Sequence, residues 1–231
     1  MLTVKMKICV ALAIIGALAV TGAKADFLEN FDSYLNGSQM HGQGGWKGWD
    51  NDVAWGALVS NAQSLSAPHS VDINGVSDLV QEFDGMTSGT WTITAQQYIP
   101  SASTGTSYFI MLNQYNYGVA YAWSIQMAYN LSAGTVDEDL VGGGATQDIV
   151  RDQWVELKVE VVLDAYTATA YYNGLQLGSG DWYGEQKEID AIDLYANGAD
   201  SVYYDDVSTV PEPATLAVLA LGGLALIRRR R

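Results

Sequence analysis

The amino-acid sequence predicts an all-β protein. Between residues 26 and 209, short segments rich in Val, Ile, Thr, Tyr and Trp are separated by clusters of Gly, Asn, Asp and Ser, a pattern typical of strands joined by turns. No long stretch in this part has the 3.6-residue hydrophobic period of a helix. Because many short strands must each bury one face, we expect the chain to close as a sandwich or a barrel.

The first expected strand of this region lies at residues 27–34. Residues 36–52, which carry Trp46 and Trp49, form a glycine-rich loop after that strand. Strands are expected at residues 27–34, 54–60, 70–73, 79–83, 90–98, 107–114 and 122–130.

The clearest strand signal lies at residues 154–163. Val155, Leu157, Val159, Val161 and Leu163 alternate there with Glu156, Lys158 and Glu160. This alternation predicts a strand with one face in the core and the other in water. The chain then returns at 167–172, and Asn173-Gly174 predicts a two-residue hairpin turn into 175–177. The last strands are expected at 188–195 and 201–207.

The amino terminus has the three parts of a secretory signal peptide. Two lysines precede an apolar run at residues 8–20, and Ala23 and Ala25 supply the small residues at which signal peptidase cleaves. We therefore expect residues 1–25 to be a signal helix that is removed. The single cysteine, Cys9, lies inside this segment, so the remaining chain has no thiol chemistry or disulfide.

The carboxyl terminus has three parts in a fixed order. Pro211, Glu212 and Pro213 precede an apolar run at residues 214–227, and Arg228, Arg229, Arg230 and Arg231 close the chain. As a helix the run would be about 21 Å long, which is short against the roughly 30 Å hydrocarbon core of a bilayer. A hydrophobic helix in this tail is therefore expected to enter the inner membrane only transiently.

This tail resembles the PEP-CTERM sorting signal of Gram-negative bacteria, which the membrane protease exosortase processes. The resemblance covers residues 210–231. It implies export across the inner membrane, exosortase and signal peptidase as processing partners, and a final place at the cell surface or in the extracellular space. Residues 26–209 would then form the one folded domain between the two targeting segments.

The folded region is strongly acidic. Without the signal and the tail from Pro211 onward, 25 acidic residues remain against four basic ones, a net charge of −21. Such a surface repels nucleic acid and anionic lipid. It is compatible with divalent cations and with neutral polysaccharide.

Three segments of the folded region resemble concanavalin A-like, laminin-G-type jelly rolls. They are ENFDSY at residues 29–34, the hairpin at 154–180, and IDLYANGADSVYYDDVS at 192–208. The resemblance implies a two-sheet antiparallel jelly-roll sandwich in which the first and last strands pair.

The loop at residues 36–52 carries the candidate glycan-binding residues Trp46, Trp49, Asp50 and Asp52. Indole faces stack on sugar rings, and neighbouring carboxylates fix hydroxyl groups. The alternative is that the two indoles are core residues, because most tryptophans in a sandwich are buried. Exposure of both would favour ligand binding, and burial of both would favour a structural role.

A calcium site is the second candidate. If the first and last strands pair, Glu29 or Asp32 would meet Asp205 or Asp206, and Ca²⁺ prefers oxygen ligands of this kind. The alternative is that these carboxylates are simply part of an acidic surface.

An enzymatic function is the competing interpretation. The segment from Glu188 to Asp193 resembles the Glu-x-Asp-x-x-Glu strand of laminarinase-like glycoside hydrolases, which implies Glu188 as nucleophile, Asp190 as its orienting partner and Asp193 as acid/base. Asp193 departs from that pattern, because its side chain is one methylene shorter than glutamate. The alternative is a row of solvated carboxylates at a sheet edge. We therefore expect a non-enzymatic surface or matrix protein, with a polysaccharide-active enzyme as the alternative if Glu188 and Asp193 line one cleft.

Overall fold

The computed structural model describes residues 27–141, 146–182 and 187–212. The predicted signal peptide with Ala23 and Ala25, Pro213, and the tail with Arg228, Arg229, Arg230 and Arg231 lie outside this part. Within the described residues, no helix is long and apolar enough to cross a membrane.

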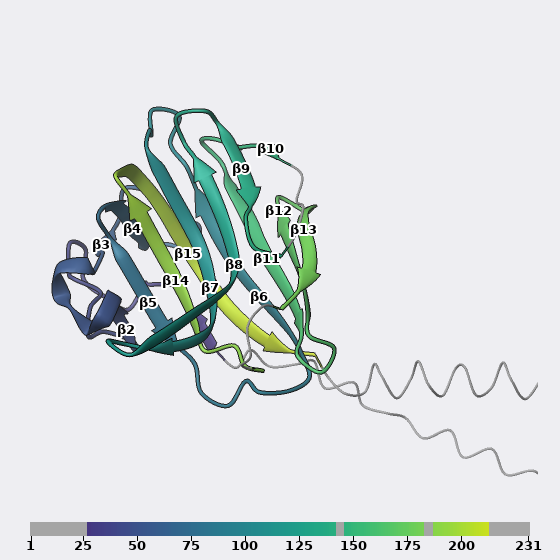
Figure 1. Ribbon diagram of the computed structural model, residues 1–231. Helices are drawn as coiled ribbons and strands as arrows, with labels where there is room; N and C mark the ends of the chain where they lie inside the picture. Colours follow the sequence, from purple (N-terminus) through teal and green to yellow (C-terminus); the bar gives the residue numbers. More distant parts are fainter. Residues whose placement is uncertain (1–26, 142–145, 183–186, 213–231) are drawn as a thin grey trace, which may run out of the picture.

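Two antiparallel sheets pack face to face (Figure 1), which confirms the predicted all-β class. The eight-stranded sheet runs in the order β13 (Leu175–Asp181), β12 (Thr167–Tyr172), β11 (Trp154–Val162), β6 (Thr90–Tyr98), β15 (Ala199–Pro211), β4 (Ser70–Gly75), β3 (Leu58–Ser60), with β1 (Phe27–Glu29) also paired to β15. The seven-stranded sheet runs in the order β10 (Gln147–Asp148), β9 (Thr135–Glu138), β8 (Ala120–Asn130), β7 (Thr106–Asn116), β14 (Ala191–Asn197), β5 (Asp78–Glu82), β2 (Trp46–Gly48). Two short 3-10 helices, Trp49–Asn51 and Val53–Trp55, follow β2.

The core lies between the sheets and follows the period-2 pattern of the strands. In β11, residues 155, 157, 159 and 161 are buried, while Glu156 on the opposite face is exposed. From the other sheet, Phe109, Ile192 and Leu194 join the same hydrophobic cluster. Burying one face of each strand in this way fixes the pairing register, since a slip of one residue would turn the apolar side chains into water.

The first and last strands pair, as the sequence predicted. Phe27 lies opposite Thr209 and Glu29 opposite Val207. β15 continues as far as Pro211, which pairs with Trp91 of β6. The first residues of the predicted sorting tail are therefore part of the sheet.

Two expected strands are shorter than predicted because local hydrogen bonds interrupt them. The strand expected at 27–34 ends at Glu29, whose carboxylate accepts a hydrogen bond of 2.8 Å from the backbone N–H of Phe31. Phe31 has a positive φ of 60°, which ends extended structure. The strand expected at 54–60 begins only at Leu58, because the Asp52 side chain caps the 3-10 turn at Ala54 N with a bond of 2.9 Å.

The strand β13 is longer than predicted because glycine has a packing role in it. A Cβ atom on Gly180 would lie 1.9 Å from the carbonyl oxygen of Val141. The glycines that suggested the end of a strand instead allow another segment to pack closely on it. The short strands β2, β9 and β10 were not predicted, since two to four residues carry too little alternation to be recognised.

Candidate functional site

The candidate site lies on the outer face of the seven-stranded sheet, away from the main core. In β14, Ile192 and Leu194 face the core, so Asp193 and Tyr195 project from the other face. Asp193 lies opposite Val80 of β5 and opposite Ile110 of β7.

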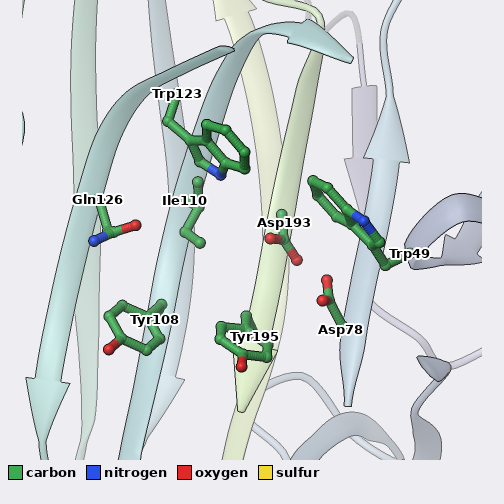
Figure 2. Close-up of a pocket in the computed structure, with 8 residues that line it drawn as sticks. All are labelled: Trp49, Asp78, Tyr108, Ile110, Trp123, Gln126, Asp193 and Tyr195. Carbon is green, nitrogen blue, oxygen red and sulfur yellow. The ribbon is translucent and has the colours of Figure 1, made fainter. Parts of the chain in front are cut away.

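A pocket of about 290 Å³ opens on this outer face, close to the lower end of the range for small-ligand sites. Strands β5, β7, β8 and β14 line it together with the first residue after β2 (Figure 2). The lining residues are Trp49, Asp78, Tyr108, Ile110, Trp123, Gln126, Asp193 and Tyr195.

Two pairs of aromatic rings form much of the pocket wall. The rings of Trp49 and Trp123 are nearly parallel, with centroids 6.2 Å apart and an interplanar angle of 11°. The rings of Tyr108 and Tyr195 stack at 5.5 Å and 16°. Figure 2 shows the indoles on either side of Asp193 and the two tyrosines together at the other end of the pocket. Trp123 keeps 37% of its surface exposed, so the wall is open to a ligand.

Asp78 and Asp193 point toward one another between these rings (Figure 2). Tyr195 is the residue directly opposite Asp78, so Asp193 and Asp78 are diagonal neighbours on adjacent strands. The two carboxyl groups share a hydrogen bond. Asp193 is only 2% exposed, and the Oδ1 atom of each carboxyl group has no hydrogen-bond partner.

Burial dominates the electrostatics of this carboxyl pair. Loss of solvation raises the pKa of Asp78 to about 6. Loss of solvation, and then the charge of Asp78, raise the pKa of Asp193 well above its usual value. With a pKa of about 6, Asp78 is mostly ionised at neutral pH, while Asp193 holds its proton more tightly than a free carboxyl group does.

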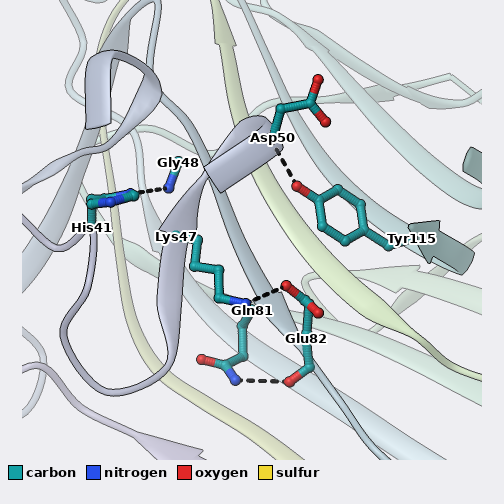
Figure 3. Close-up of polar contacts among 7 residues, drawn as sticks. All are labelled: His41, Lys47, Gly48, Asp50, Gln81, Glu82 and Tyr115. Carbon is teal, nitrogen blue, oxygen red and sulfur yellow. Dashed lines mark hydrogen bonds and ion pairs between the residues drawn. The ribbon is translucent and has the colours of Figure 1, made fainter. Parts of the chain in front are cut away.

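The indole of Trp49 is positioned by the neighbouring residue, Asp50. The Asp50 backbone N–H donates a 2.9 Å hydrogen bond to the Tyr115 hydroxyl (Figure 3). The Asp50 carboxylate accepts hydrogen bonds from the Tyr121 hydroxyl and from Gly118 N. Trp49 packs against the Tyr115 and Tyr121 rings, at 5.0 and 4.7 Å between centroids. These contacts fasten the loop after β2 to the end of the β7–β8 hairpin.

The same loop is also fastened to β5 and to its own start. Lys47 forms a 2.7 Å ion pair with Glu82, and Gly48 N donates a 3.1 Å hydrogen bond to His41 Nδ1 (Figure 3). None of the eight lining residues is basic, and Lys47 is already paired.

Of the four predicted glycan-binding residues, only Trp49 lines the pocket. Trp46 is fully buried, with its ring 6.2 Å from that of Phe27 and 5.8 Å from that of Phe31. Trp46 therefore cannot stack on a sugar, and the structure corrects this prediction. Asp50 positions the loop, and Asp52 is an exposed cap of a 3-10 turn.

The other pocket residues were missed because they are far apart in the sequence. Asp78, Trp123 and Tyr195 belong to three strands that the topology brings together. One signal was available. In the expected strand at 107–114, the positions opposite the core carry Tyr108 and Ile110, where a solvated face would carry polar residues.

The four predicted calcium ligands each accept hydrogen bonds from the protein itself. Glu29 accepts hydrogen bonds from Phe31 N and the Tyr34 hydroxyl, and Asp32 accepts one from His69 N. Asp205 accepts hydrogen bonds from Leu65 N and Ser66 N, and Asp206 accepts one from the Ser66 hydroxyl. In the part of the chain that the structure describes, no three His, Cys, Asp or Glu side chains are grouped so as to hold a metal ion.

The predicted pairing of Glu188 with Asp193 is also not present in the pocket. Glu188 precedes β14 and does not line the pocket. Asp193 instead meets Asp78. Asp190, the expected orienting residue, accepts a 2.5 Å hydrogen bond from Tyr115 N, so it supports the β7 bend near Trp49.

The comparisons with known proteins first concern the end of the chain. Residues 209–231 match the family model described as the PEP-CTERM protein-sorting motif. The chain carries a PEP-CTERM sorting signal. The PEP-CTERM motif indicates export, processing by exosortase, and a cell-surface or extracellular location. No curated protein matches the chain in amino-acid sequence.

Solved structures resemble the folded body of this PEP-CTERM protein. A sialidase matches at a TM-score of 0.55 and 10% identity, over 81% of this chain and 18% of that one. A *T. cruzi* calreticulin globular domain matches at 0.52 and 9%, over 89% and 95%. *Trypanosoma rangeli* sialidase in complex with sialic acid matches at 0.52 and 14%, over 81% and 31%. The chain thus spans less than a third of the length of these sialidases, and at such identities the likeness concerns the fold alone.

Proposed function

We propose that this protein is an exported, exosortase-sorted surface or matrix protein whose jelly-roll body binds glycan without cleaving it. The single observation that carries the binding function is the pocket on the seven-stranded sheet, in which two nearly parallel indoles flank a pair of buried carboxyl groups. The sorting signal supplies the route, through signal peptidase, a transient stay in the inner membrane, and exosortase.

The chemistry of the pocket suits a sugar ring. The aliphatic C–H faces of a pyranose stack on the flat indoles of Trp49 and Trp123. Asp78 and Asp193 line the pocket, and the carboxyl oxygens that face it can accept hydrogen bonds from ring substituents. An apolar wall with a few convergent polar groups is the usual composition of such sites.

The competing function, a glycoside hydrolase, is favoured by one observation and opposed by another. Burial raises the pKa values of both Asp78 and Asp193, and acid/base catalysis uses carboxyl pairs whose surroundings shift their pKa values. Glycosidase carboxyl groups, however, stand about 5 Å or more apart so that the scissile bond fits between them. Two carboxyl groups that hydrogen-bond to each other leave no such space, which supports binding over cleavage.

The test is a binding screen on the full chain, purified in mild detergent, against an array of neutral and charged glycans. We expect selective binding that Trp123→Ala abolishes. Trp55→Ala is the matched control, because Trp55 is equally exposed at 40% but lies outside the pocket. Absence of binding to any glycan, or equal loss in both variants, would contradict the proposal. Release of reducing ends from a bound polysaccharide would establish the hydrolase instead.

A further inference from the structure

We propose that the ligand of this pocket is an amino sugar, a pyranose with a free protonated amino group that lies against the Asp78–Asp193 carboxyl pair. The inference rests on the glycan-binding function proposed above and specifies the class of sugar. Four features of the pocket support it.

The first feature is that each carboxyl group of the pocket has a buried oxygen without a hydrogen-bond donor. Asp193 is 2% exposed and lines the pocket, and its Oδ1 atom and that of Asp78 have no partner. A neutral hydroxyl group would donate one hydrogen bond and leave the buried negative charge unbalanced. An ammonium group donates three N–H bonds and carries the opposite charge, and a buried carboxylate gains most from a partner that supplies both.

The second feature is the aromatic surround. The Trp49, Trp123, Tyr108 and Tyr195 rings all border the space in front of the carboxyl pair (Figure 2). Cations are attracted to the faces of such rings, and to tryptophan most strongly. Aromatic rings around carboxylates therefore favour an ammonium group over an acetamido group, which has no charge.

The third feature is the absence of any counter-charge in the pocket lining. No Lys, Arg or His is among its eight residues, and Lys47 on the same sheet is held by Glu82 at 2.7 Å. A carboxylated sugar such as sialic acid would bring a third negative group against Asp78 and Asp193. The pocket is thus suited to the opposite charge from the ligand in the sialidase complex that the fold resembles.

The fourth feature is the rigidity of the wall. Asp50 ties Trp49 to Tyr115 and Tyr121 before any ligand arrives. A site whose rings are already held in place loses less conformational freedom on binding. The preference for an amine over its acetylated form then depends on side chains that are already in place, and not on their ordering when the ligand binds.

The experiment compares two trisaccharides of the same length, glucosamine trimer and N-acetylglucosamine trimer, by calorimetric titration of the full chain at pH 7. A salt concentration near 0.15 M screens the general attraction of a cation to an acidic protein to within about 8 Å. We expect the amine to bind at least about tenfold more tightly, the factor that one good charged contact supplies. The preference should disappear in Asp78→Asn and in Asp193→Asn.

The matched control is Asp164→Asn, which removes the same charge from the exposed turn between β11 and β12. It should leave the preference unchanged. Equal affinity for the two trimers would overturn the amino-sugar inference while leaving glycan binding intact. A preference that falls equally in Asp78→Asn and Asp164→Asn would also overturn it, because the attraction would then be to the whole surface. Failure of every glycan to bind would remove the proposed function as well.

Discussion

Replacing Asp78 by Asn should stabilise the protein, and only above the pH at which the carboxyl pair ionises. The pKa of Asp78 rises from 3.8 to about 6 on folding, so the folded state holds a proton that the unfolded state has released between those values. Stability therefore falls as pH rises through this window and stays low above it. The shift corresponds to about 3 kcal/mol at alkaline pH. The charge of Asp50 adds to the rise in the pKa of Asp78, whereas the hydrogen bond with Asp193 opposes it.

The expected gain for Asp78→Asn is about 2 kcal/mol at pH 8, because the lost carboxyl hydrogen bond offsets about 1 kcal/mol of the relief. At pH 4 Asp78 is protonated in the folded wild type, so the lost hydrogen bond dominates and the variant should be up to about 1 kcal/mol less stable than wild type. Urea denaturation followed by tryptophan fluorescence at both pH values measures the difference. A variant that is less stable at pH 8, or that differs equally at both pH values, would refute the account of a buried, proton-sharing pair.

The other predictions concern the pocket wall and the packing of the folded domain. Trp46→Ala should lower the free energy of unfolding by about 3–5 kcal/mol, as for other buried aromatic side chains; a loss below about 1 kcal/mol would show that Trp46 is not a core residue. Tyr121→Phe removes the hydroxyl that holds Asp50 and should weaken the near-ultraviolet circular dichroism of the tryptophans, whereas an unchanged spectrum would mean that Trp49 is held without it. Gly180→Ala places a Cβ against the Val141 carbonyl and should reduce the yield of folded protein and its melting temperature, which a thermal melt against wild type can check; an unchanged melting temperature would show that the two segments can separate without cost. EDTA should leave the melting temperature unchanged, because the four candidate calcium ligands already accept protein hydrogen bonds. A fall in melting temperature that added Ca²⁺ reverses would show that the protein binds calcium.

Most of the fold could be predicted from the sequence, because each long strand can be recognised from the pattern of its own residues. The alternation at residues 154–163 gives β11 with its buried face correct, and the Asn173-Gly174 turn lies between β12 and β13 as expected. Strand ends were less predictable, since they depend on side chains such as Glu29 that bond to the local backbone. The pairing of β1 with β15 followed from the resemblance to jelly rolls, not from any local signal.

The site was harder to predict because its residues meet only through the topology. Asp78 and Asp193 are neighbours because β5 and β14 pair, and neither the spacing nor the chemistry of their segments indicates this. The loop with Trp46 and Trp49 supplies one residue, Trp49, to the candidate pocket. Sequence alone cannot decide which indole faces outward, since that depends on β2 pairing with β5, where Trp46 lies opposite Gln81 and turns into the core.

The most direct test of glycan binding at this pocket is the affinity of the full chain for glucosamine trimer, measured for wild type, Trp123→Ala and Trp55→Ala. The account predicts that Trp123→Ala weakens binding by about tenfold or more, since a stacked ring contributes on the order of 1.4 kcal/mol or above, while Trp55→Ala binds like wild type. Equal affinity of all three proteins would contradict the stacking of the ligand on Trp123.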